Sequence, residues 1–226
     1  MRLHVETLFT HDAAGRMVGV NEPNGKDAPR FFLGRAADGG RVWRVRHDVD
    51  DTLTEALEAA CLAEQDDDSL LRPPYGSAPY EELVSRSAPV ERIWTGPAYR
   101  FPADLSAAPD AVKVTAQNAD VLRPHLEAWL GDVATGQPMA AALADGRAVS
   151  VCCSVRIGAR AHEAGVETVP EFRGRGHAAQ VVVAWAAAVR AMGVVPLYST
   201  SWENTRSQAL ARKLGLRRYG STLHVT

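Results

Sequence analysis

The sequence has few cysteines and no long apolar segment. Its 226 residues include three cysteines, Cys61, Cys152 and Cys153, which is too few for a disulfide framework and favours a reducing compartment. The longest apolar run, residues 181–189, is far shorter than the roughly 20 residues that a helix needs to span a bilayer. The N-terminus lacks the apolar core of a secretion signal. We therefore expect a cytoplasmic protein with no membrane partner.

The chain also lacks an excess charge of either sign. Its formal net charge is −2, so no overall field attracts nucleic acid, and we expect no nucleic-acid partner. Aspartates at residues 66–68 are candidates for a metal site, but consecutive carboxylates usually form a solvated run, and we expect no metal. The content of 46% apolar and 23% charged residues is typical of a globular protein with a sizeable core.

The N-terminal part predicts an α/β region over residues 1–105. Residues 31–46 read as a β-hairpin around a glycine turn, and residues 51–64 as a helix capped by Asp51. A loop follows at 65–79, and residues 90–100 read as a strand pair. The Pro- and Ala-rich stretch 101–111 is the expected junction between two parts of the chain.

The second part, residues 110–226, shows a sharper pattern of strands and helices. We expect strands at 112–116, 137–144, 148–157, 162–169, 194–201 and 219–225, and helices at 120–131, 176–192 and 205–214. Gly215 would end the last helix in a left-handed conformation. This order predicts an α+β fold in which helices pack on a mixed sheet.

The stretch VPEFRGRGHA joins a strand to the long helix. Backbone N–H groups at the start of a helix have no partner within the helix, and the helix dipole makes that end positive. Gly174 and Gly176 allow a bulky anion to approach the backbone, and Arg173 and Arg175 add charge. A dinucleotide fingerprint needs a third glycine, where Ala179 stands, and no GxxxxGK[ST] phosphate loop is present. A diphosphate group fits this loop well.

The loop resembles the pyrophosphate loop of the GNAT superfamily of acyl-CoA-dependent N-acyltransferases, [QR]-x-x-G-x-[GA]. Arg173, Gly176 and Ala178 match it in register. The segment WENTRSQALARKLGLRRYG resembles the second signature of that family, about 30 residues further on. Its matching positions are Asn204, Ser207, Leu210, Lys213, Gly215 and Leu216. The resemblance is specific over residues 162–220.

The resemblance implies a splayed sheet whose opening binds acetyl-CoA. The family's pattern places backbone contacts with the pantetheine arm at Glu167, Thr168 and Val169, with the oxyanion donor near Glu167. The diphosphate loop comprises Arg173, Gly174, Arg175, Gly176, His177 and Ala178. Asn204 and Ser207 are further candidates for cofactor contacts, although Asn204 equally suits a helix cap.

The resemblance also implies an acetyl-CoA-dependent N-acetyltransferase that acts on a primary amine of a small molecule or a protein. Glu163 stands where family members place a glutamate base, and a structural carboxylate is the alternative interpretation. Ala211 stands where many members have a tyrosine acid, which leaves the general acid open.

Two further questions stay open. The alternative function is a catalytically degenerate module that binds CoA or a partner. Residues 1–105 suit a degenerate second copy of the fold or a substrate-side region, and a homodimer is among the alternatives for the oligomeric state.

Overall fold

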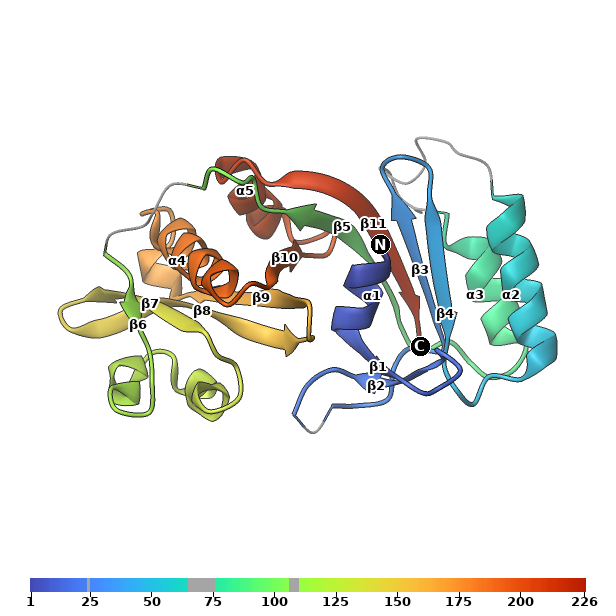
Figure 1. Cartoon of the computed structure of the whole chain (residues 1–226), viewed down its shortest axis with the longest axis horizontal. Coiled ribbons are helices and arrows are strands. Elements are labelled where there is room, and N and C mark those ends of the chain that lie inside the picture. The colour runs from blue at the N-terminus through green and yellow to red at the C-terminus, as the bar shows by residue number, and fades with distance from the viewer. Residues whose placement is uncertain (24, 65–75, 106–109) are drawn as a thin grey trace. The chain divides into compact units, whose positions relative to one another are not determined.

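The chain divides into two units, each built from strands and helices (Figure 1). The computed structural model describes residues 1–23, 25–64, 76–105 and 110–226. Unit 1 contains Met1–Tyr99, Ser199–Asn204 and Arg218–Thr226, and unit 2 contains Arg100–Tyr198 and Thr205–Arg217. The single division expected near residues 105–110 stays a prediction. The two units do not follow one another simply along the chain, because Ser199–Asn204 and Arg218–Thr226 belong to unit 1 again.

Unit 1 is centred on strands that lie in the order β4-β3-β11-β5. The strands are β3 (Phe31–Ala36), β4 (Arg41–Val45), β5 (Ile93–Arg100) and β11 (Arg217–Val225). β3 and β4 form the predicted hairpin, and β3 also pairs antiparallel with β11. The last strand of the chain is therefore bound to a strand near its start.

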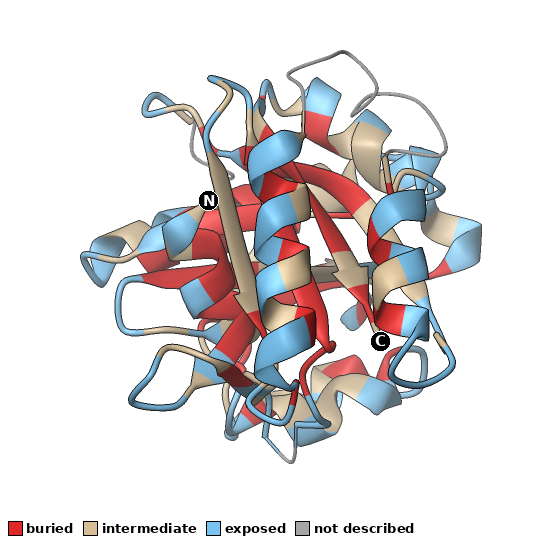
Figure 2. Ribbon diagram, turned by 90° about the vertical axis from the view of Figure 1, so that its right-hand side faces the viewer, coloured by how far each residue is buried: buried red, intermediate tan, exposed pale blue. Residues whose placement is uncertain are grey.

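Both faces of β3 are buried. Phe31 and Leu33 pack with the helices α2 (Asp51–Ala63) and α3 (Ala78–Ser85) on one face. Phe32 packs on the other face with α1 (Arg2–Leu8) and the small antiparallel sheet of β1 (Phe9–His11) and β2 (Met17–Val20). Alternating side chains of one strand thus join two apolar clusters. Figure 2, viewed from the side of α2 and α3, shows exposed residues on the outer surface of these helices.

Two expectations for unit 1 were wrong in detail. Asp50, not Asp51, caps α2, because its carboxylate accepts a hydrogen bond from Leu53 N at 2.8 Å. Residues 90–100 contain one strand, β5, rather than a strand pair. The helix α3 was not predicted, and the aspartates at 66–68 lie outside the described residues.

Unit 2 is centred on strands in the order β10-β9-β8-β7-β6. The strands are β6 (Val112–Lys113), β7 (Met139–Ala144), β8 (Arg147–Ile157), β9 (Ala161–Thr168) and β10 (Val195–Ser199). β6 to β9 pair antiparallel, whereas β10 runs parallel to β9. The turn between β7 and β8 contains Asp145 and Gly146, both with positive φ, which suits a tight hairpin turn. The mixed α+β fold is confirmed.

Helices cover both faces of the sheet in unit 2. α4 (His177–Ala191) contacts β7, β8 and β9 and buries a wide apolar face that includes Val181, Trp185 and Val189. Residues of the 3₁₀ helices η2 (Ala119–Leu122) and η3 (Glu127–Val133) form the other core cluster with the sheet. α5 (Thr205–Lys213) ends at Gly215, whose φ of 63° and flanking hydrogen bonds form the predicted left-handed cap.

One helix prediction in unit 2 was wrong. Residues 120–131 form two short 3₁₀ helices instead of one α-helix. Pro124 disfavours the helical conformation at the preceding residue, and Arg123 is extended with ψ of 147°. The chain therefore turns at this point. Among the described residues, no helix is long and apolar enough to cross a membrane.

His4 in unit 1 makes the stability of the fold depend on pH. Burial lowers the pKa of His4 to about 3, and its Nδ1 lies 2.5 Å from the hydroxyl of Tyr219. The unfolded chain has a pKa near ~6.5 at this position, so below about pH 6.5 the unfolded state takes up a proton that the folded state does not. Unfolding therefore becomes easier as the pH falls.

We expect His4 to reduce the free energy of unfolding by about 2 kcal/mol between pH 7 and pH 5. Urea denaturation at the two pH values measures this difference. His4→Gln should show a smaller pH dependence, because glutamine does not titrate, whereas replacement of the exposed His47 by Gln should leave it unchanged. If His4→Gln and the unaltered protein show the same pH dependence of the free energy of unfolding, another group causes the effect.

Candidate functional site

The strands β9 and β10 pair at one end and then separate. Their parallel pairing joins Val195, Pro196 and Leu197 to residues 161–163 of β9. β9 continues to Thr168 and pairs there with β8 on its other edge. In the described part of unit 2, the edge of β9 beyond Glu163 therefore has no strand partner. This is the splayed opening that the family resemblance implied.

The register of β8 and β9 decides which backbone groups face the opening. Val169 N donates to Val149 O across the ladder at 2.9 Å. Backbone groups of alternate residues point to the same edge in an antiparallel pair, so Glu167 also faces β8. The N–H groups of Val166 and Thr168 then point to the open edge. The Thr168 carbonyl accepts a hydrogen bond there from Arg173 Nε at 3.1 Å.

The glycine loop follows β9 directly and leads into α4. Gly174 and Gly176 have φ of 78° and 94°, values that side chains with a Cβ rarely adopt. A Cβ on Gly174 would meet nothing within 4 Å, so its surface is open. In the described part of the chain, the N–H groups of Gly174, Arg175 and Gly176 donate to no protein acceptor. Together with the first N–H groups of α4, they form a cradle of free donors, which is the kind of backbone group that binds anions at helix N-termini.

Cationic side chains surround this cradle. Arg173 folds back onto the end of β9, whereas the guanidinium of Arg175 lies 5.2 Å from the ring centre of Phe172. A Cβ on Gly176 would lie 3.8 Å from Lys213 Nζ, at the end of α5. The two sequence signatures thus meet in space, because the lysine of the second lies beside the glycine of the first. His177 and Ala178 begin α4 at the same place.

Glu163 lies at the point where β9 and β10 separate. It is opposite Leu197, the last paired residue of β10, and its side chain is 4% exposed. Glu167 lies further along β9, where its carboxylate accepts a hydrogen bond from Trp129 Nε1 at 2.6 Å. A Cβ on Gly165 would lie 2.2 Å from Val155 Cγ1 and 3.3 Å from the Trp129 ring, so the absence of a side chain there makes room mainly for Val155 and also for the indole. The sequence carried no signal for this contact.

A hydrogen-bonded network fixes the other face of β9 to α4. Trp185 Nε1 donates to Ser154 Oγ at 3.0 Å, and Ser154 Oγ lies 2.9 Å from His162 Nδ1. The serine hydrogen can then donate to the histidine, which suits the neutral form of the ring. Burial lowers the pKa of His162, in agreement with this arrangement. His162 is therefore a structural residue on the face opposite Glu163.

The candidates on α5 and before it fall in different units. Ser207 belongs to unit 2, where its Oγ lies 2.8 Å from the hydroxyl of the buried Tyr198 on β10. Asn204 belongs to unit 1, and its N–H bonds to Ser201. Ala211 is fully buried on α5. The sequence did not reveal the pairing of Tyr198 with Ser207, which depends on how β10 packs against α5.

None of the three cysteines suits a nucleophile. Burial raises the pKa of Cys61 and Cys153 to about 12, and it also raises that of Cys152. A thiol with such a pKa carries almost no thiolate at neutral pH.

Within the described residues, no group of three or more His, Cys, Asp or Glu side chains is placed to hold a metal ion.

Comparison with known proteins finds a family that resembles part of the chain. Residues 140–221 match the family model of the GNAT acetyltransferases. The matched part is similar to a GNAT acetyltransferase domain and amounts to a little over a third of the chain. It spans β9, the glycine loop, α4 and α5. No curated protein matches the sequence.

One solved structure shares the fold at low identity, and others are similar to a lesser degree. A GNAT-family acetyltransferase from Novosphingobium aromaticivorans is 24% identical, with a TM-score of 0.51 over 60% of this chain and 65% of that chain, which is less than two thirds of its length. An acetyltransferase of the same family from Colwellia psychrerythraea is 13% identical, with a TM-score of 0.49 over 95% of this chain and 83% of that one. AAC(6')-Iy, in complex with a bisubstrate analogue, is 23% identical over 47% of this chain and 88% of its own, with a TM-score of 0.39.

Ser154 is central to the framework of the site, because it bonds to both His162 and Trp185. Ser154→Ala should reduce the free energy of unfolding by about 1–3 kcal/mol, since it leaves two buried polar groups without this partner. Urea denaturation measures the loss. Ser85→Ala on exposed α3 is the matched control and should cost much less, and equal losses would show that the network adds little.

Proposed function

We propose that this protein is an acetyl-CoA-dependent N-acetyltransferase that acts on a primary amine of a small molecule or a protein. The observation that carries the proposal is the open edge of β9, which ends directly at a loop with free N–H donors and surrounding cations. An extended chain with amide groups fits the edge, and a diphosphate fits the loop. Acetyl-CoA has both parts in this order.

The residues around the loop fit the diphosphate group. Gly174 and Gly176 leave the backbone accessible, and Arg175 and Lys213 supply positive charge. The N–H groups of Val166 and Thr168 are the proposed partners of the pantetheine arm and of the acetyl oxygen. They take the role first expected of the backbone N–H near Glu167, because the N–H of Glu167 faces β8. Thr168 and Val169 complete the path from the edge to the loop. When bound, acetyl-CoA supplies the thioester carbonyl that the amine attacks.

Glu163 is the proposed general base. An amine such as that of lysine has a pKa near ~10.4, so it must lose a proton before it can attack. Glu163 lies at the fork between β9 and β10, where the reacting end of an extended ligand would be. Glu167 is less suited to this role, because its carboxylate is held by Trp129.

The hydroxyls of Tyr198 and Ser207 are the proposed proton source for the departing thiolate. They lie 2.8 Å apart, on the strand and helix that follow the opening. A free thiol has a pKa near ~8.5, so the thiolate needs little assistance to leave. This pair takes the role that a tyrosine at Ala211 would have.

Ala211 also favours the second candidate, a degenerate module that binds CoA or a partner without catalysis. Release of free CoA thiol in the presence of amines distinguishes the two functions. We keep the division into a region 1–105, either a degenerate copy of the fold or a substrate-side region, and a GNAT-like domain 110–226 as part of the proposal.

Gly176→Val should abolish measurable binding of acetyl-CoA in a calorimetric titration. The valine side chain would project into the cradle toward Lys213 and keep the diphosphate from the backbone donors. Gly146→Val is the matched control, because Gly146 has a similar φ of 75° with nothing within 4 Å and lies in the β7–β8 turn. Both variants should lose similar stability from backbone strain. Unchanged affinity in Gly176→Val would remove the loop from the proposed site.

Glu163→Gln should lower the rate of acetyl transfer by roughly 10²–10⁴-fold while affinity for acetyl-CoA stays within about twofold, because a base acts on the amine and not on the cofactor. Release of CoA thiol with spermidine, glucosamine and a lysine-containing peptide measures the rate. Glu58→Gln, on the exposed face of α2, serves as the control. A parallel loss of affinity and rate would indicate a structural role for Glu163.

A further inference from the structure

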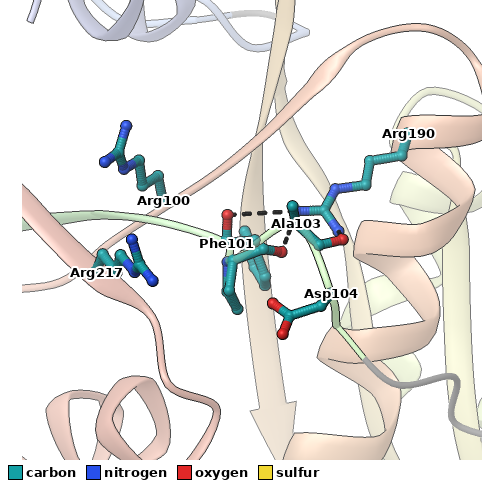
Figure 3. A pocket seen from close by; sticks show the side chains of 7 residues that line it. Arg100, Phe101, Ala103, Asp104, Arg190 and Arg217 are labelled. Atoms are coloured by element: carbon teal, nitrogen blue, oxygen red, sulfur yellow. Dashed lines mark hydrogen bonds between the residues drawn. The ribbon is translucent and has the colours of Figure 1, made fainter.

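A cavity of about 540 Å³ lies in unit 2, outside the proposed acetyl-CoA site (Figure 3). Its lining consists of Arg100, Phe101, Pro102, Ala103, Asp104, Arg190 and Arg217. These residues come from the end of β5 and the segment after it, the last turn of α4 and the start of β11. Cavities of this size hold small organic ligands.

One wall of the cavity is held in place by Arg190. Its guanidinium donates hydrogen bonds to the carbonyl oxygens of Phe101, Pro102 and Ala103, at 3.3, 2.6 and 3.2 Å. The ring of Phe101 packs 6.0 Å from that of Trp185, in the core beneath α4. The segment that carries Asp104 is thus fixed to the helix. Arg190 thus uses three of its five N–H donors within the chain and contributes to the shape of the cavity.

The other charged groups of the cavity have no such partners. Arg100, Arg217 and Asp104 are exposed, and across the described residues none of them forms an ion pair. Figure 3 shows the guanidinium groups of Arg100 and Arg217 on the same side of the cavity, with Asp104 on another side. Three arginines and one aspartate leave an excess of positive charge in a protein whose net charge is −2.

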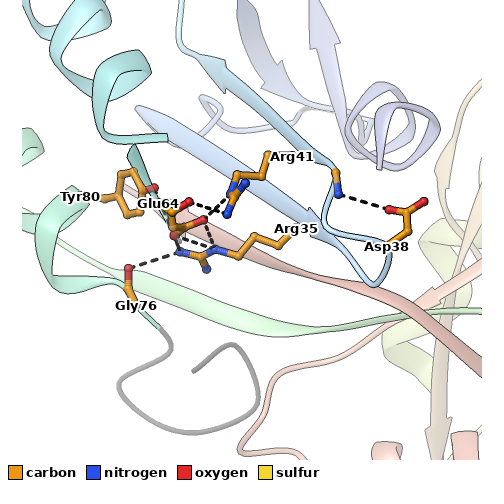
Figure 4. A network of polar contacts seen from close by, with 7 residues as sticks. Arg35, Asp38, Arg41, Glu64, Gly76 and Tyr80 are labelled. Carbon is orange, nitrogen blue, oxygen red and sulfur yellow. Dashed lines mark hydrogen bonds and ion pairs between the residues drawn. The ribbon is translucent and has the colours of Figure 1, made fainter. Parts of the chain in front are cut away.

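Unit 1 contains a contrasting pair of arginines (Figure 4). Arg35 and Arg41 both bind the carboxylate of Glu64, which also accepts a hydrogen bond from Tyr80. Although burial acts against ionisation of Glu64, the two arginines lower its pKa. There the chain itself supplies the anion. At Arg100 and Arg217 the described residues supply none.

The cavity is remote from the diphosphate loop. Arg190 follows His177 by 13 residues on the same helix, α4. At a rise of 1.5 Å per residue, this corresponds to about 20 Å along the helix axis. The loop lies at the N-terminal end of α4 and the cavity at its C-terminal end. A diphosphate in the loop and an anion in the cavity would therefore occupy different sites.

We propose that this cavity binds a small organic anion that carries phosphate or carboxylate groups. Arg100 and Arg217 bind the oxyanion, since the planar guanidinium matches two acceptor oxygens at once. Asp104 accepts a hydrogen bond from a hydroxyl or ammonium group of the same ligand. The site is separate from acetyl transfer and does not depend on the proposed function.

Calorimetric titration of the full chain with inorganic phosphate and with malonate, at constant ionic strength, tests the proposal. We expect saturable binding with a Kd below about 1 mM for at least one of the two anions. The double variant Arg100→Gln/Arg217→Gln should bind that anion at least tenfold more weakly. Arg218→Gln, next to Arg217 and also exposed but outside the cavity, should change the Kd less than twofold.

Comparison of the two anions shows whether the natural ligand carries a phosphate or carboxylate groups. Phosphate binding alone indicates a phosphate ester, and malonate binding alone a polycarboxylate. Circular dichroism verifies that each variant is folded. If the double variant is unfolded, the affinities of the single variants Arg100→Gln and Arg217→Gln test the proposal in its place. The absence of saturable binding of either anion to the unaltered protein would overturn the proposal. So would binding to the folded double variant with unchanged Kd, because the anion would then lie elsewhere, as in the glycine loop.

Discussion

The separation of β10 from β9 is the constraint on which the candidate site depends. The strands pair over residues 195–197 and then diverge, which leaves one edge of β9 without a strand partner in the described part of unit 2. Backbone N–H and C=O groups that are not paired must bond to water or to a ligand. An extended ligand with its own amides can add to such an edge as a strand would. The divergence thus determines both the shape of the opening and the kind of molecule that fits it.

The rest of unit 2 holds this edge beside the glycine loop. The network of Ser154, His162 and Trp185 connects β8, β9 and α4. Because α4 begins at the loop, its buried apolar face also fixes the direction of the first N–H groups of the helix. Binding sites gain affinity when their groups are ordered before the ligand arrives. The core of unit 2 supplies this order, so the loop itself needs few stabilising contacts.

Local features of the site could be predicted from the sequence, whereas those that depend on pairing could not. The loop and α4 follow from glycines, a proline and apolar periodicity within a short stretch, and the cap at Gly215 follows from one residue. The register between β8 and β9 decides which backbone N–H groups face the opening. A shift of one residue would turn the N–H of Glu167 toward the opening and those of its two neighbours toward β8. The contact of Trp129 with Glu167 and the pairing of β11 with β3 join residues far apart in sequence. No local pattern encodes them.

The packing around Ala211 bears on the missing tyrosine. Ala211 is fully buried, so a tyrosine there would require neighbouring side chains to move, and overpacking of a core destabilises it. Ser207 and Ala211 are four residues apart on α5 and share a face of the helix. The buried Tyr198 reaches Ser207 on that face from β10. Under the proposed function, a phenol supplied by the strand takes the place of one supplied by the helix, and the small side chain of Ala211 limits the bulk on that face. Under the second candidate, the same packing only holds β10 against α5.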